Sequence, residues 1–265
     1  MPASPTHASS ACLEAFRRDG VLGGIRLLTE NHCRDLAEHL RSSPPAPVDW
    51  CKGRAVSDRL IYDVATRPVA LELVRSLLGP NIILWGAIVA EQPAGETHAW
   101  RADIETSLQS GDSVSIWMGL KNTHRASTLE LITGSHRAGK PVQQVAAEHG
   151  LSREDVTAEM ALSWAREAAP DARLARPALN NGEAVVFDGR IWHASFNRDP
   201  DQTRTALVLQ YANADMAVRM PDFSQIEWPF QFRSRPRPPV IPICGRPNSH
   251  ANRVVAPPRS RARPA

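Results

Sequence analysis

Four apolar runs rich in β-branched and aromatic residues limit the fold of this chain more than any other feature. They occupy residues 82–91, 113–120, 183–187 and 204–211, and each has the composition of a buried strand. The interval 141–176 interrupts them with an alanine- and glutamate-rich stretch that predicts a helical insert. Apolar residues at helical spacing in 11–41 predict two helices with a turn, and 68–78 predicts another helix that ends at Gly79-Pro80. Helices followed by strands with one helical insert predict an α+β fold, a jelly-roll barrel buttressed by N-terminal helices.

Composition excludes several classes of protein. The chain has 265 residues, of which 42% are hydrophobic, enough to fill a core, and its longest apolar run is too short to cross a membrane. Residues 1–12 are polar and lack the apolar centre of a secretory signal, so we expect cytoplasmic residence. The four cysteines are scattered without a CxxC pair, which favours reduced thiols over a zinc site or a disulfide framework.

The net charge of +3 hides an uneven distribution. Residues 228–265 hold eight arginines and no Asp, Glu or Lys, so the rest of the chain carries 3 − 8 = −5. Such a tail could hold nucleic acid or acidic lipid. However, its Pro-Pro steps at 238–239 and 257–258 are expected to prevent a helix or a strand ladder, and no aromatic residues interleave after Phe232. We therefore interpret it as a solvated wrapping tail and expect a small-molecule partner, with no nucleic acid and no membrane.

The residues that suggest chemistry are His193, in the stretch 192–197, and Arg204 eleven positions later. A non-haem ferrous site takes two imidazoles and one carboxylate on one face of the metal, which leaves positions for 2-oxoglutarate and dioxygen. The distal carboxylate of 2-oxoglutarate requires a buried cation, and arginine offers a bidentate one. Taken alone, a histidine on a strand is more often a packed, hydrogen-bonded core residue.

Several motifs in the same order resemble the phytanoyl-CoA dioxygenase family of Fe(II)- and 2-oxoglutarate-dependent oxygenases, over nearly the whole chain. They are residues 16–21 (FRRDGV), 77–80 (LLGP), 115–120 (SIWMGL), 131–136 (LITGSH) and 182–187 (GEAVVF), followed by His193 and Arg204.

The resemblance implies a double-stranded β-helix and the hydroxylation of a small molecule coupled to decarboxylation of 2-oxoglutarate, with dioxygen as cosubstrate. It implies that His193 binds iron, that Arg204 anchors 2-oxoglutarate, that Ser195 contacts the same cosubstrate, and that Gln92 and Trp117 line its pocket. We expect one oxygenase-like domain over 1–265. Its parts are N-terminal helices at 11–80, the barrel at 81–135 and 180–232, a helical insert or lid at 140–178, and a Pro- and Arg-rich tail at 233–265.

The chain departs from the family at the first metal ligand. The family has His-x-Asp, and here Asp103 matches the carboxylate while Arg101 takes the place of the histidine. Residues two apart share a face of a strand, so Arg101 is expected to point where the imidazole would. A guanidinium stays protonated and has no lone pair for iron. The simplest local arrangement is an ion pair between Arg101 and Asp103.

Three explanations of Arg101 remain open. In the first, a bulge or bend lets His98 supply the missing nitrogen, because His98 and Asp103 would otherwise face opposite ways. In the second, Asp103, His193 and 2-oxoglutarate hold iron weakly. In the third, iron is lost, and the pocket serves binding, a non-redox reaction or the silent subunit beside an active paralogue. As partners of the whole chain we expect either a second copy in a homo-oligomer or such a paralogue. We predict an oxygenase with a compromised metal site; the alternative is a catalytically silent binding or regulatory protein on the same scaffold.

Overall fold

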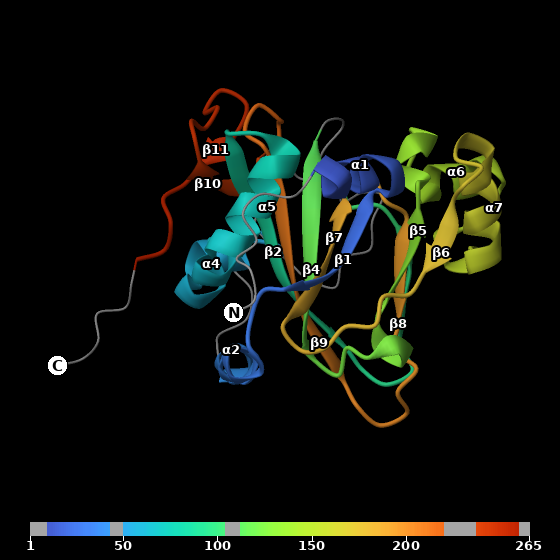
Figure 1. Cartoon of the computed structure of the whole chain (residues 1–265), viewed down its shortest axis with the longest axis horizontal. Coiled ribbons are helices and arrows are strands. Elements are labelled where there is room, and N and C mark those ends of the chain that lie inside the picture. Colours follow the sequence, from blue (N-terminus) through green and yellow to red (C-terminus); the bar gives the residue numbers. More distant parts are fainter. Residues whose placement is uncertain (1–9, 43–49, 104–111, 220–236, 260–265) are drawn as a thin grey trace.

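Two β-sheets packed face to face form the centre of the protein, which we describe from a computed structural model (Figure 1). The structure describes residues 10–42, 50–103, 112–219 and 237–259. The larger sheet has the strand order β1-β7-β4-β9-β2-β10-β11 and the smaller one β3-β8-β5-β6; all pairs are antiparallel except β10 with β11. The elements are α1 (Ser10–Asp19), β1 (Val21–Arg26), α2 (Glu30–Ser42), α3 (Arg54–Ser57), α4 (Arg59–Ala65), α5 (Pro68–Leu78), β2 (Ile82–Gln92), β3 (Thr97–Arg101), β4 (Ser113–Lys121), η1 (Arg125–Ser127), β5 (Leu129–Thr133), η2 (Ser135–Ala138), α6 (Val142–Glu148), η3 (Arg153–Asp155), α7 (Ala158–Ala168), β6 (Arg173–Ala175), β7 (Glu183–Asp188), β8 (His193–Phe196), β9 (Arg204–Asn213), β10 (Pro239–Cys244) and β11 (Arg253–Val254).

The layers follow the burial pattern of the strands. One face of the larger sheet packs against α1, α2, α4 and α5 in the largest apolar cluster, and its other face meets the smaller sheet. In Figure 1 the layers run from α2, α4 and α5 through the larger sheet to β5, β6 and β8, with α6 and α7 outermost. Because β4, β7 and β9 are buried on both faces, they read as nearly continuous apolar runs.

The four predicted strands and the helix at 68–78 are confirmed as β2, β4, β7, β9 and α5. Pro68 starts α5 at a position that needs no backbone N–H, and Gly79, with φ 85°, ends it. The mixed α+β jelly roll with N-terminal helices is confirmed as well.

The prediction of two helices within 11–41 is wrong in its middle part. Residues 21–26 form β1, which pairs with β7 at the edge of the larger sheet, between α1 and α2. Two glycines, Gly23 and Gly24, interrupt any helix there, and Gly24 has φ 72°. Edge pairing with a strand more than 150 residues away then decides the conformation.

The prediction that the Pro-rich tail stays out of strand ladders is wrong for residues 239–244. They form β10, which pairs with β2, and Val240 and Ile241 are fully buried. Pro239 is the first residue of this strand, and β10 has only the two-residue β11 on its outer side, so the missing proline N–H groups cost little. The arginines at 233, 235, 261 and 263 lie outside the described residues. None of the helices that the structure describes is long and apolar enough to cross a membrane.

The predicted helical insert is present as α6, η3 and α7, and it covers the outer face of the smaller sheet. Its buried side chains, mostly alanine and valine, pack with Trp100 of β3, Ala194 of β8, Ile132 of β5 and Trp192. The opposite face of that sheet is left for the interior between the two sheets. The role of a lid stays a prediction.

Candidate functional site

The site is built on the pairing of β3 with β8. Arg101 lies opposite His193 and His98 opposite Ser195, with an irregularity in the register between the two pairs. Residues directly opposite in an antiparallel ladder share a face, and His193 and Ser195 are two apart on one strand. All four residues therefore lie on the same face of the smaller sheet, away from the helical insert.

Asp103 and His193 come together at one end of this face. His193 is 2% exposed, and its Nδ1 donates to the carbonyl of Ile191 at 3.0 Å, which leaves Nε2 as the lone-pair nitrogen, 3.6 Å from Asp103 Oδ1. Burial, assisted by the charges of Arg101 and Lys52, lowers the pKa of His193 to about 4 against the opposing effect of Asp103, so the imidazole is neutral. The two groups thus present a neutral nitrogen and a carboxylate, the donor types that iron takes.

Asp103 is held as an anion by its neighbours. Burial alone would raise its pKa, but His193, Lys52 and hydrogen bonds from Ser115 and Gln210 lower it, and the net direction is down. The Ser115 hydroxyl donates to Oδ2, which leaves Oδ1 facing His193. The carboxylate is therefore oriented as well as ionised.

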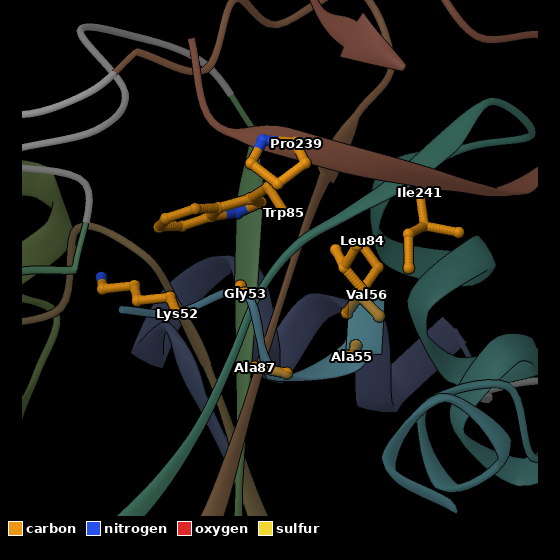
Figure 2. Close-up of a pocket in the computed structure, with 10 residues that line it drawn as sticks. Lys52, Gly53, Ala55, Val56, Leu84, Trp85, Ala87, Pro239 and Ile241 are labelled. Atoms are coloured by element: carbon orange, nitrogen blue, oxygen red, sulfur yellow. The ribbon is translucent and has the colours of Figure 1, made fainter. Parts of the chain in front are cut away.

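Lys52 reaches this end of the site from the loop before α3. Its ammonium lies 4.8 Å from the centre of the Trp85 ring, at a small, open pocket beside β2 (Figure 2). Its charge acts on both Asp103 and His193. Lys52 therefore adds positive potential at the Asp103 end.

Arg204 is the most deeply buried cation near the site. It is 1% exposed, its Nη1 donates to the carbonyl of Ser127 at 3.3 Å, and its guanidinium lies 5.2 Å from the centre of the Trp117 ring. Its Nε has no hydrogen-bond partner, and no carboxylate within the described ranges lies close enough to form an ion pair with it. Burial, followed by the charge of Arg101, lowers the pKa of Arg204 to about 10. An uncompensated buried cation is costly, so this geometry is suited to an anionic ligand.

Gln92 joins Arg204 to the β8 residues. It lies opposite Arg204 in the β2–β9 ladder, and its Nε2 donates to the carbonyl of Ser195 at 3.2 Å. The Ser195 hydroxyl donates to Gln92 Oε1 at 3.1 Å and lies 3.3 Å from His98 Nδ1. Asn197 donates to the Gln92 carbonyl at 2.9 Å. The predicted cosubstrate residues Arg204, Ser195, Gln92 and Trp117 thus lie next to one another in the protein interior.

Two predictions about the metal ligands concern Arg101 and His98. Arg101 donates to the carbonyl of Ala99 at 3.2 Å, and the contacts described for Asp103 are with Ser115 and His193. The Arg101–Asp103 ion pair stays a prediction. The register irregularity that would let His98 turn inward is present, and His98 shares the face of His193, where its Nδ1 lies 3.3 Å from the Ser195 hydroxyl. No group of three His, Cys, Asp or Glu side chains suited to a metal occurs among the residues described here. The assignment of His98 as a ligand stays a prediction.

Sequence reasoning missed four residues that shape the site: Ser115, Gln210, Lys52 and Asn197. Two of them carried a signal, because Ser115 is two positions from Trp117 on β4 and Asn197 is two positions from Ser195. Gln210 and Lys52 reach Asp103 from elements far away in sequence, and no local pattern marks them.

Comparison with known proteins decides the family. Residues 16–206 match the sequence family described as phytanoyl-CoA dioxygenase (PhyH). The chain belongs to the phytanoyl-CoA dioxygenase family. It is thereby an Fe(II)- and 2-oxoglutarate-dependent oxygenase by class, a dioxygenase whose cosubstrate is dioxygen, with a small-molecule substrate.

Several solved structures share the fold of this chain. CytC3 with Fe(II) and alpha-ketoglutarate has a TM-score of 0.65 at 16% identity, over 95% of this chain and 94% of that one. EctD from S. alaskensis, with 2-oxoglutarate and 5-hydroxyectoine, has a TM-score of 0.65 at 18% identity, covering 97% and 91%. The non-heme monooxygenase ThoJ, as a nickel complex, has a TM-score of 0.64 at 20% identity, covering 94% and 89%. No curated protein sequence matches the chain.

The described residues fit the two family cofactors unequally. The buried Arg204, with an unpartnered Nε, fits the distal carboxylate of 2-oxoglutarate. For iron, Asp103 and His193 supply two suitable donors, but Arg101 stands opposite His193 with a group that cannot be a ligand. The fit to iron is therefore incomplete.

Proposed function

We propose that this protein binds 2-oxoglutarate through Arg204 and oxidises a small molecule, with an iron site weakened by Arg101. The observation that carries the proposal is the buried Arg204 guanidinium, which has no carboxylate partner in the described part of the chain and is joined through Gln92 to Ser195. A bidentate contact with a carboxylate would compensate this charge.

Each residue of the site has a distinct task in this proposal. Arg204 binds the distal carboxylate, and Ser195 and Gln92 fix the position of the ligand beside it. Asp103, oriented by Ser115, and neutral His193 would hold the metal. Iron, when bound, supplies the activation of dioxygen, and 2-oxoglutarate supplies two electrons.

Arg101 is the residue that weakens the metal site. At about 5 Å and an effective dielectric of about 20, one positive charge repels a divalent ion by roughly 7 kcal/mol. Arg101 lies opposite His193, at the position where a third metal-binding residue would be needed. The charge of Arg101 already lowers the pKa of His193. A third donor is therefore missing and a repulsion is added.

Arg101 also favours a second function, a silent binding or regulatory protein on the same scaffold. Such a protein would act alone, as a homo-oligomer or beside an active paralogue. Against it, Asp103, His193 and Arg204 are all retained, and the first two remain oriented for a ligand. The two functions differ in one measurable property, which is whether 2-oxoglutarate is turned over to succinate when iron is supplied.

The test compares the unaltered protein with Arg101→His and Arg204→Ala. Metal analysis after loading with ferrous iron should show weak binding by the unaltered protein and an affinity higher by orders of magnitude for Arg101→His. Uncoupled turnover of 2-oxoglutarate should rise in Arg101→His, and Arg204→Ala should lose 2-oxoglutarate binding with or without metal.

Three results would change this picture. Equal 2-oxoglutarate affinities for the unaltered protein and Arg204→Ala would remove Arg204 from the site. Stoichiometric iron in the unaltered protein that His98→Ala abolishes would make His98 the third ligand. If neither the unaltered protein nor Arg101→His binds iron, the silent scaffold becomes the better description.

A further inference from the structure

Thr123, in the turn that follows β4, has a buried hydroxyl without a hydrogen-bond partner. The residue is 2% exposed, and its Oγ1 forms no hydrogen bond within the described ranges. A hydroxyl that is removed from water and left unpaired destabilises the fold, so such groups are uncommon in native proteins. A ligand group that accepted a hydrogen bond at this point would remove that cost.

The larger sheet places this hydroxyl on the face that carries Arg204. A Cβ added at Gly119 would collide with Thr123 Oγ1, so the hydroxyl lies directly over Gly119 of β4. Gly119 is two residues from Trp117 and opposite Ala206, and both of these side chains pack between the two sheets. Because residues two apart on a strand share a face, Thr123 packs onto the interior face of the larger sheet.

The side chain of Arg204 reaches the same part of that face. Arg204 is on β9, and its guanidinium lies 5.2 Å from the centre of the Trp117 ring. Trp117 pairs with a residue four positions further along β9, so the two side chains lean toward each other. Between them lies the rung of Gly119 and Ala206. Two donors without partners in the described part of the chain, Arg204 Nε and the Thr123 hydroxyl, therefore lie beside one rung.

Hydrogen bonds hold the turn that carries Thr123. Asn122 has φ 52°, the one positive value at a non-glycine residue in the described part of the chain, and its Nδ2 donates to the carbonyl of Gln202 at 3.2 Å. The Ser127 hydroxyl donates to the Asn122 carbonyl, and the Ser127 carbonyl accepts from Arg204 Nη1. The same turn therefore fixes the position of Thr123 and that of the Arg204 guanidinium.

We propose that the Thr123 hydroxyl donates a hydrogen bond to the carboxylate that Arg204 binds, so that Thr123 makes the site selective for a ligand with a distal carboxylate. This inference rests on the proposed function, because Arg204 must hold that carboxylate. A carboxylate has two oxygens and accepts several hydrogen bonds, so one ligand group satisfies both Arg204 Nε and Thr123 Oγ1. An uncharged ligand end of the same size leaves both donors unpaired.

The test is calorimetric titration with 2-oxoglutarate and with 2-oxopentanoate, which has a methyl group in place of the distal carboxylate. Each titration is done with ferrous iron under nitrogen and again with a chelator. Thr123→Val keeps the shape of the side chain and removes the hydroxyl. It should weaken 2-oxoglutarate about tenfold and leave 2-oxopentanoate within about twofold. Thr123→Ser, which keeps the hydroxyl, should retain most of the affinity for 2-oxoglutarate.

Thr128→Val is the matched control. Thr128 also has a buried hydroxyl without a partner in the described residues, but its backbone is extended and the next residue, Leu129, packs with Trp117 between the sheets. The Thr128 side chain therefore points away from that face, and Thr128→Val should bind 2-oxoglutarate like the unaltered protein. Thermal unfolding without ligand is the second readout. Thr123→Val should melt no lower than the unaltered protein, because valine removes an unpaired hydroxyl.

The outcomes separate this inference from the function it rests on. If Arg204→Ala weakens 2-oxoglutarate and Thr123→Val does not, the role of Thr123 is overturned and the proposed function stands. Thr123→Val that melts well below the unaltered protein, or that weakens both ligands equally, would show a structural role for Thr123 and overturn the inference. If no form binds 2-oxoglutarate with or without iron, both proposals are overturned.

Discussion

Arg101 of β3 lies directly opposite His193 of β8, so a permanent cation and a metal-binding type of side chain share one rung of the smaller sheet. His193 keeps its Nε2 turned toward Asp103, and Asp103 remains ionised, although their environment contains an arginine that opposes a metal. The site thus combines features of an oxygenase with features of an anion-binding pocket, and each can be tested separately.

The hydrogen bonds of Ser195 should matter for ligand binding more than for folding. Ser195→Ala removes the bonds to Gln92 and His98, so we expect 2-oxoglutarate affinity to fall about three- to tenfold while the melting temperature changes little. Calorimetric titration and thermal unfolding check the two parts. Ser163→Ala, at an exposed position of α7, is the matched control, and an unchanged affinity of Ser195→Ala would remove this hydroxyl from the site.

The insert should exchange its amide hydrogens faster than the barrel. The buried side chains of α6 and α7 are mainly alanine, whereas β9 is paired on both sides within the larger sheet. Hydrogen exchange followed by mass spectrometry should therefore show less protection in 146–169 than in 204–211. Equal protection in the two segments would argue against a mobile lid.

Gly182 should be one of the least replaceable glycines. It has φ +87°, and a Cβ there would meet the carbonyl oxygen of Leu28, whose backbone N–H in turn bonds to the Gly182 carbonyl. We expect Gly182→Ala to lower the free energy of unfolding by at least about 2 kcal/mol, from strain plus collision. Gly139→Ala, with φ +70° and open space around the new Cβ, should cost only about 1 kcal/mol in the same urea titration. Equal costs would show that the backbone at Leu28 yields readily.

The Cys33 thiol should not react with alkylating reagents unless the solution is strongly alkaline or the protein is unfolded. Burial raises its pKa to about 11 from an ordinary value of 9.0, so the thiolate is scarce at pH 8. Iodoacetamide labelling with mass spectrometry should modify Cys12, which is only partly buried, well before Cys33. Because the folded pKa is the higher one, Cys33 contributes stability that is complete below pH 9 and is lost as the pH rises through about 11. Rapid labelling of Cys33 in the folded protein at pH 8 would contradict this.

The sequence predicts the fold best where burial on both faces leaves an unambiguous pattern. The runs that became β2, β4, β7 and β9 are of this kind. β1 contains two glycines and forms only because β7 is available to pair with it, and β10 tolerates its prolines because it lies near a sheet edge. Neither condition is visible within the segment itself.

Much of the candidate site could be predicted, because its residues lie on strands with a regular alternation of side chains or within the family motif. The alternation of side chains along a strand places Arg101 on the face of the expected histidine, and the family motif places His193 and Arg204. The position of His98 depends on an irregularity between it and Arg101, which the residue types do not reveal. Gln210 and Lys52 act on Asp103 only through tertiary packing, so spacing alone could not identify them.

The strand from the Pro-rich segment has a consequence for how the protein is made. During synthesis β2 emerges from the ribosome long before β10. The edge of β2 that pairs with β10 therefore stays without a partner strand until residues 239–244 have emerged, and β2 has apolar residues on both of its faces. Over that interval the nascent chain presents an open edge to other chains. A chain whose synthesis ended between β9 and β10 would therefore contain all the site residues, but the open edge of β2 could still pair with a strand of another protein.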